Sequence, residues 1–121
     1  MRSAAQAYQS IAKQTASPRD LEADLLLKAA SRLQSIQDRW ESDQNLLDEA
    51  LLYNRKLWSI FLTSATSNDN PLPTDVRQNV ANLGLFVMNQ TVSMLSNPKP
   101  ESLRPLISIN RELAAGLRTI R

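Results

Sequence analysis

Hydrophobic residues recur every three or four positions through most of the chain, a spacing that places them on one face of an α-helix. This pattern predicts four longer helices, over residues 17–40, 42–64, 72–96 and 102–119. The first begins at Ser17-Pro18, a pair that favours a helix start, and Ser42-Asp43 and Ser102 stand in comparable positions before the second and fourth. Segments rich in Ser, Asn, Asp and Pro separate the helices, as at residues 64–72.

A shorter amphipathic segment, residues 4–15, precedes these helices and carries Tyr8 and Ile11 on one side. A helix of this length is marginal in water by itself, so we expect it to dock on its own domain or on a partner. The chain contains only two glycines, fewer than a sheet protein normally needs for its turns. We therefore predict a single all-α domain, residues 1–121, built as a helical bundle of about four longer helices plus the short N-terminal helix.

Two asparagines, Asn54 and Asn110, interrupt the apolar faces of the second and fourth longer helices. An amide in such a stripe needs hydrogen-bond partners, since an unsatisfied buried group costs about 1–3 kcal/mol. We interpret both amides as structural groups that fix the register of neighbouring helices, with direct contact to a partner as the alternative. The arginines that follow them, Arg55 and Arg111, lie at the margins of the stripes, where they are expected to reach solvent or an acid.

The second longer helix has the widest apolar arc in the chain. Four further apolar residues extend its stripe beside Asn54: Leu46, Tyr53, Leu57 and Ile60. A helix that is apolar over more than half of its circumference is usually the central one, so we expect this helix to be enclosed by the others.

The third longer helix carries a second apolar face, formed by Ala81, Leu85, Met88 and Val92, in addition to its core stripe. These residues belong to the core if the helix lies between two others. If they are exposed, they form a groove for an amphipathic helix of a partner, and methionine is favoured on such adaptable surfaces. Gly84, between the two faces, would allow another helix to approach closely.

Arg104, Arg111 and Arg118 are spaced by seven residues and therefore line one side of the last helix. They form either a solvated flank or a basic surface for an acidic partner segment or RNA phosphates. No stacking platform for bases remains, because the aromatic residues of the longer helices are expected in the core: Trp40, Tyr53, Trp58, Phe61 and Phe86. We therefore do not expect direct nucleic-acid binding.

Composition removes several classes of function. The chain has no cysteine and no histidine, which excludes disulfides, thiolate or imidazole metal ligands, and the usual general base. No carboxylate pair stands in the context of a base or a metal site, so we expect no catalytic residues, no metal and no cofactor. The net charge is only +2, and no apolar run is long enough for a membrane span or a signal peptide. These features predict a cytoplasmic protein that does not insert into membranes.

Four stretches, at residues 7–26, 52–62, 72–88 and 106–117, together form an ordered pattern over nearly the whole chain. The most characteristic is Asn54-Arg55-Lys56-Leu57-Trp58-Ser59-Ile60-Phe61, followed by Ile109-Asn110-Arg111 with Ala114, Gly116 and Leu117. In these stretches the chain resembles the FlaF family, flagellar biosynthesis regulators of alphaproteobacteria.

The resemblance implies a small helical cytoplasmic protein that binds flagellin and promotes its synthesis and secretion. It also implies a connection with FlbT, a counteracting regulator of flagellin mRNA translation, and no catalytic residues. We accordingly expect a flagellin export chaperone, whose binding groove lies around Leu85, Met88 and Val92 beside the arginines at 104, 111 and 118. The alternative is a post-transcriptional regulator that acts on flagellin mRNA with or against FlbT.

Overall fold

The computed structural model describes residues 18–119, and the helix expected over residues 4–15 lies outside them. The described chain contains helices and no strand, which confirms the predicted all-α class. Its four long helices are α2 (Pro18–Asp38), α4 (Leu47–Ala65), α5 (Thr74–Ser96) and α6 (Leu103–Thr119). The remaining elements are a short helix, α3 (Trp40–Asp43), and two 3₁₀ turns, Gln44–Leu46 and Pro100–Ser102. No helix in this part of the chain is long and apolar enough to cross a bilayer.

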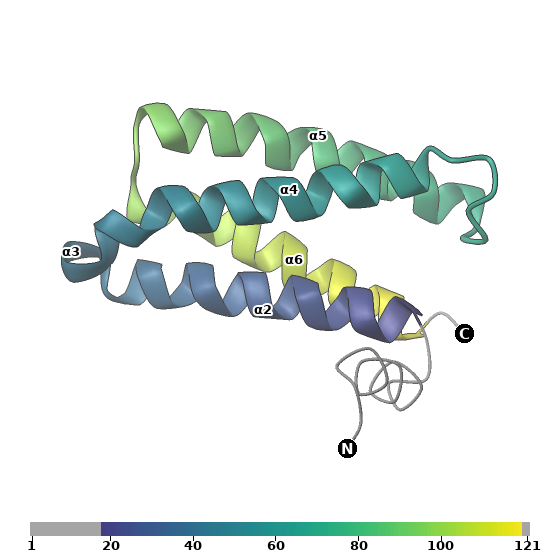
Figure 1. The fold of residues 1–121 in the computed structure, drawn as a ribbon, viewed down its shortest axis with the longest axis horizontal. Coiled ribbons are helices and arrows are strands. Elements are labelled where there is room, and N and C mark those ends of the chain that lie inside the picture. The colour runs from purple at the N-terminus through teal and green to yellow at the C-terminus, as the bar shows by residue number, and fades with distance from the viewer. Residues whose placement is uncertain (1–17, 120–121) are drawn as a thin grey trace, which may run out of the picture.

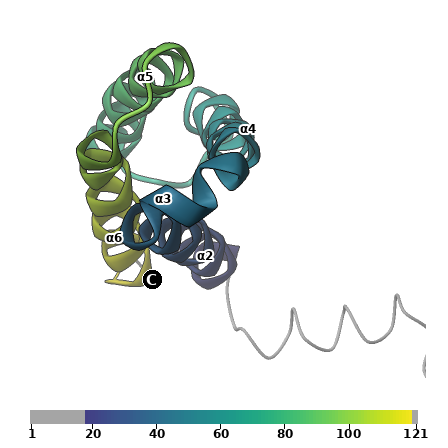
Figure 2. The ribbon, with the colours of Figure 1, turned by 90° about the vertical axis from the view of Figure 1, so that its left-hand side faces the viewer.

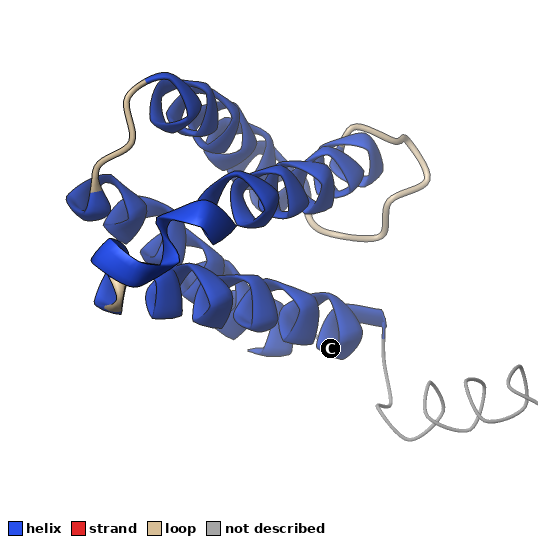
Figure 3. Cartoon of the chain, turned by 60° about the vertical axis from the view of Figure 1, so that its left-hand side comes forward, coloured by secondary structure: helices blue, strands red, loops and turns tan. Residues whose placement is uncertain are grey.

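The long helices form two antiparallel pairs. In Figure 1, α4 and α5 lie above α2 and α6, and the view along the helices in Figure 2 shows the four arranged around a common centre. The α2–α6 pair and the α4–α5 pair are packed most extensively, α4 also packs on α2, and α5 touches α6 only sparsely. In the turned view of Figure 3, the layer of α4 and α5 diverges from the layer of α2 and α6.

The junction between the first two long helices differs from the prediction. The first helix ends at Asp38 rather than Trp40, and the next begins at Leu47 rather than at Ser42-Asp43. Ser42 and Asp43 do not cap a helix here: the Ser42 hydroxyl donates to the Arg39 carbonyl at 3.2 Å, and the Asp43 carboxylate pairs with the Arg39 side chain at 3.3 Å. These local bonds hold the chain in a short turn of helix before α4 starts.

The loop between α4 and α5 is fixed by two polar side chains. Asn70 donates from Nδ2 to the Ser64 carbonyl at 3.0 Å and accepts from the Leu72 N–H at 2.8 Å. Arg77 donates from Nε to the Ala65 carbonyl at 2.7 Å, which satisfies a carbonyl at the end of α4 with a cation, as the helix dipole favours. The loop therefore closes α4 and α5 into a defined helical hairpin.

Gly84 brings α4 and α5 into close contact, as the sequence suggested. A Cβ atom at this position would lie 2.4 Å from Cδ2 and 2.7 Å from Cγ of Leu62. A methyl group cannot fit at these distances unless Leu62 moves. The glycine thus permits the approach of the two helices despite its low helix propensity.

The breadth of the apolar arc on α4 does not reflect burial. Leu57 is buried, but Leu46, Tyr53 and Ile60 are 43%, 38% and 60% exposed, so the expectation that α4 is enclosed is wrong. The helix packs mainly on α5 and α2, which leaves its outer side open. The helical spacing of the first long helix favoured Leu25, Ala29, Leu33, Ile36 and Trp40 as its core face. In the structure Leu25 of α2 and Trp40 of α3 are only partly buried, and the buried residues of α2 are Ala23, Leu26, Ala29, Ala30, Leu33 and Ile36.

Candidate partner-binding site

Asn54 and Asn110 meet in the core, where both are fully buried. Asn110 of α6 donates from Nδ2 to Oδ1 of Asn54 on α4 at 2.8 Å, and its Oδ1 accepts from the indole Nε1 of Trp58 at 2.9 Å. Its Nδ2 also lies 3.4 Å from the Leu26 carbonyl of α2. One side chain therefore links three helices, which fits the interpretation of these amides as structural groups that set register.

The amide of Asn54 is only half satisfied. Its Nδ2 is buried and has no hydrogen-bond partner among the described residues. Next to it, Trp58 makes an edge-on contact with Phe61, with ring centroids 6.0 Å apart. Leu57, Phe61 and Leu117 complete this buried group, whereas Arg55, Arg111 and Gly116 are exposed.

The second apolar face of α5 is accessible. Leu85 and Val92, one heptad apart, are 64% and 57% exposed, while Met88 is half-buried and packs against the core. The helix borders α4 on the side of Gly84 and Leu62. Because α5 is not enclosed between two helices, its apolar residues at positions 85 and 92 form an unpartnered strip on the hairpin.

The arginines of α6 face a different part of the molecule. Arg118 pairs with Asp24 of α2, and Arg104 and Arg111 line a polar pocket that includes Gln34 and Gln37 of α2. No residue of α5 lines that pocket. The structure therefore does not bring the arginines and the apolar residues of α5 into one groove, contrary to the expectation that they flank the same site.

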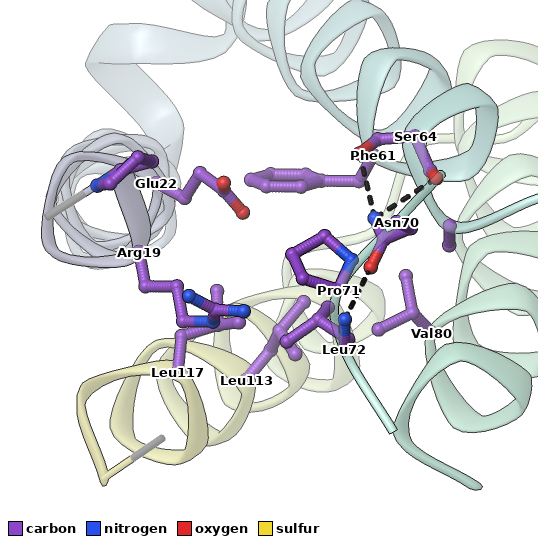
Figure 4. Close-up of a pocket in the computed structure, with 12 residues that line it drawn as sticks. Arg19, Glu22, Phe61, Ser64, Asn70, Pro71, Leu72, Val80, Leu113 and Leu117 are labelled. Carbon is purple, nitrogen blue, oxygen red and sulfur yellow. Dashed lines mark hydrogen bonds between the residues drawn. The ribbon is translucent and has the colours of Figure 1, made fainter. Parts of the chain in front are cut away.

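A further pocket, which the sequence did not point to, opens at the end of the bundle where α2 begins. Its cavity is about 240 Å³ and is mostly apolar. Figure 4 shows side chains from five parts of the fold turned toward this space. Those that the structure places in its wall include Pro18, Arg19 and Glu22 of α2, Phe61 and Ala65 of α4, Pro71 and Leu72 of the loop, Val80 of α5, and Leu113 and Leu117 of α6.

Two charged side chains stand at the wall of this end pocket. Burial raises the pKa of the Glu22 carboxyl above its usual range, and the nearby Arg19 lowers it by a smaller amount. Nε of Arg19 is buried and has no hydrogen-bond partner within residues 18–119. In the sequence the two residues look like ordinary charges of a helix start, so only the fold reveals that they border an apolar cavity.

The described residues contain no group of acidic side chains placed to hold a metal ion. Several large apolar side chains on α4 and α5 are exposed on their surface, among them Ile60, Leu85 and Val92. The chain belongs to the FlaF family: the family model for flagellar protein FlaF matches residues 4–117. It is therefore a flagellar protein. Neither the curated proteins nor the solved structures contain a match to the chain.

Proposed function

We propose that this FlaF protein binds flagellin and promotes its synthesis and secretion, acting as a non-catalytic export chaperone in the cytoplasm. The observation that supports the proposal is the exposed apolar strip of α5, on which Leu85 and Val92 lie one heptad apart in a chain of a flagellar family. An amphipathic helix with apolar residues at the same spacing can pack along such a strip.

The physical need for a chaperone arises from the flagellin monomer. Its terminal segments pair as helices only in the filament, so before export their apolar faces have no partner. Exposed apolar faces associate with one another, and a helix that covers them prevents this. The strip on α5 offers such a cover without any rearrangement of the helical core. Half-buried Met88, which lies between Leu85 and Val92 in sequence, can adapt its shape to the bound helix.

Gel filtration of the purified protein with flagellin monomers tests the proposal. At micromolar concentrations the two should elute as one complex. The double variant Leu85→Glu, Val92→Glu should not form it, because charges would replace both apolar contacts. A matched control, Asn79→Glu with Ser93→Glu, adds the same charge at exposed positions that lie about 80–140° around the same helix from Leu85 and Val92, and it should bind normally. Equal binding by both variants would reject this strip as the site.

A second function is supported by a separate observation. Arg104 and Arg111 are exposed and form no ion pair within the described part of the chain, so they are available to phosphates of flagellin mRNA or to an acidic segment of FlbT. A mobility shift with the flagellin leader RNA would support RNA binding if it weakened with salt and disappeared on Arg104→Glu with Arg111→Glu. No shift at low salt would exclude direct RNA binding.

A further inference from the structure

The end pocket combines an apolar wall with two partly buried charged side chains. Nε of Arg19 lacks a hydrogen-bond partner in the part of the chain that the structure describes, and the half-buried Glu22 carboxyl has Arg19 as a nearby opposite charge. Phe61, Leu72 and Leu113 supply apolar surface around them. This combination suits an occupant that inserts an apolar side chain and brings main-chain or cationic groups to the rim.

We propose that the occupant is the N-terminal segment of this same chain, residues 4–15, with Tyr8 and Ile11 inserted in the pocket. The segment is tethered at the site, because Pro18 itself lines the pocket. Ile11 precedes Pro18 by seven residues, and a stretch of that length spans about 10 Å as a helix and about 23 Å when extended. The tether is therefore long enough to return Ile11 to the cavity when the chain reverses direction before Pro18.

Charge and tethering both favour this segment over a free partner. Residues 1–17 contain Arg2 and Lys13 and no acidic residue, which complements the carboxylate of Glu22. Attachment through a short linker gives an effective concentration on the order of millimolar, so even weak contacts suffice for binding. The segment is also part of the region that the FlaF family shares, since the match begins at residue 4.

The docked segment would cover one end of the bundle and give the short amphipathic helix the packing surface that it needs for stability. This inference is independent of the binding of flagellin on α5, because the end pocket and the strip at Leu85 and Val92 share no residue. Its failure would leave the proposed function untouched, and the reverse also holds.

Disulfide trapping tests the proposal directly, because the natural chain has no cysteine. Ala7→Cys leaves Tyr8 and Ile11 intact and is paired with Leu72→Cys in the pocket wall. Under mild oxidation of dilute protein, this pair should form an intramolecular disulfide, which requires Cα atoms within about 7 Å. The control pair, Ala7→Cys with Leu85→Cys on the outer face of α5, should remain largely reduced.

Two further outcomes separate the possible occupants. Adding Tyr8→Ser and Ile11→Ser to the first pair should abolish the disulfide, whereas Gln6→Ser with Gln9→Ser should preserve it. Disulfide-linked dimers in place of a monomeric product would assign the pocket to a second copy and overturn the proposal. Equal oxidation of the two cysteine pairs would also overturn it, because the segment would then have no preferred site.

Discussion

Asn110 donates its side-chain amide to Oδ1 of Asn54 at 2.8 Å, and this bond joins α6 to α4 between residues 56 positions apart in the sequence. The same Asn110 accepts from Trp58 and lies within hydrogen-bond distance of the Leu26 carbonyl of α2. The two amides are not equivalent, because Asn110 uses both of its polar atoms and Asn54 uses only its oxygen. The two Asn-Arg segments, which lie far apart in the sequence, thus converge on one contact in the core.

This asymmetry predicts different costs for the two truncations. Asn110→Ala leaves both Trp58 Nε1 and Asn54 Oδ1 buried without partners, and each such group costs about 1–3 kcal/mol. Asn54→Ala removes one of the two acceptors of Asn110 Nδ2, which keeps the Leu26 carbonyl as the other. This substitution should lower the free energy of unfolding by about 1–3 kcal/mol. Denaturant unfolding followed by tryptophan fluorescence should therefore show the larger loss for Asn110→Ala.

Asn54→Leu serves as the control for packing. It fills the volume and removes the unpartnered Nδ2, so it should cost less than Asn54→Ala. The interpretation of these amides as structural groups would be wrong if Asn110→Ala unfolded at the same denaturant concentration as the natural protein.

The two glycines should respond in opposite ways to alanine. At Gly84 the new methyl group meets Leu62, and overpacking of about 1–3 kcal/mol outweighs a gain in helix propensity of about 1 kcal/mol. Gly84→Ala should therefore lower the melting temperature. In a Leu62→Ala background the side chain that blocks the new methyl group is absent, so Gly84→Ala should raise the melting temperature there.

Gly116 provides the matched comparison on α6, because a Cβ atom there would have no neighbour within 4 Å. Gly116→Ala should raise the free energy of unfolding by up to about 1 kcal/mol through helix propensity alone. If Gly84→Ala stabilised the natural protein as much as Gly116→Ala does, α4 and α5 could not approach each other as closely at Gly84 as the structure shows.

Glu22 should make stability depend on pH. Its pKa is raised in the folded state by burial, so the folded protein holds this proton more tightly than the unfolded chain does. The protonated Glu22 carboxyl contributes stability to the folded state. This contribution is fully present below the pKa of Glu22 in the unfolded chain, near 4.3, and is lost as the pH rises through its pKa in the folded protein. Glu22→Gln should thus be more stable than the natural protein at pH 7, and the difference should shrink as the pH falls toward 4. A difference that stayed constant with pH would contradict this assignment.

Much of the fold could be predicted from the sequence because the helices carry strong local signals. Pro18 at the start of α2 and the polar loop before Thr74 mark boundaries through backbone chemistry that acts within a few residues. The junction around Ser42 was predicted wrongly, since the cap residues there bond to Arg39 instead. Which apolar residues are buried depends on how helices pair, and this explains the unexpected exposure of Ile60.

The candidate site was predictable only in parts. Helical spacing placed Leu85 and Val92 together on a second face of α5, but it could not show whether another helix covered that face. Spacing also aligned Arg104 with Arg111, yet the side of the bundle that they occupy depends on the pairing of α6 with α2. The end pocket is formed by residues from five separate parts of the chain, so no local pattern reveals it.

An NMR titration of the ¹⁵N-labelled protein with unlabelled flagellin monomers tests most directly whether flagellin binds along the outer face of α5. The amide signals of Leu85, Met88 and Val92 should shift or broaden first, and those of Arg104 and Arg111 should change little. Shifts confined to the polar pocket lined by Arg104, Arg111, Gln34 and Gln37, with the α5 signals unchanged at saturation, would contradict binding on α5.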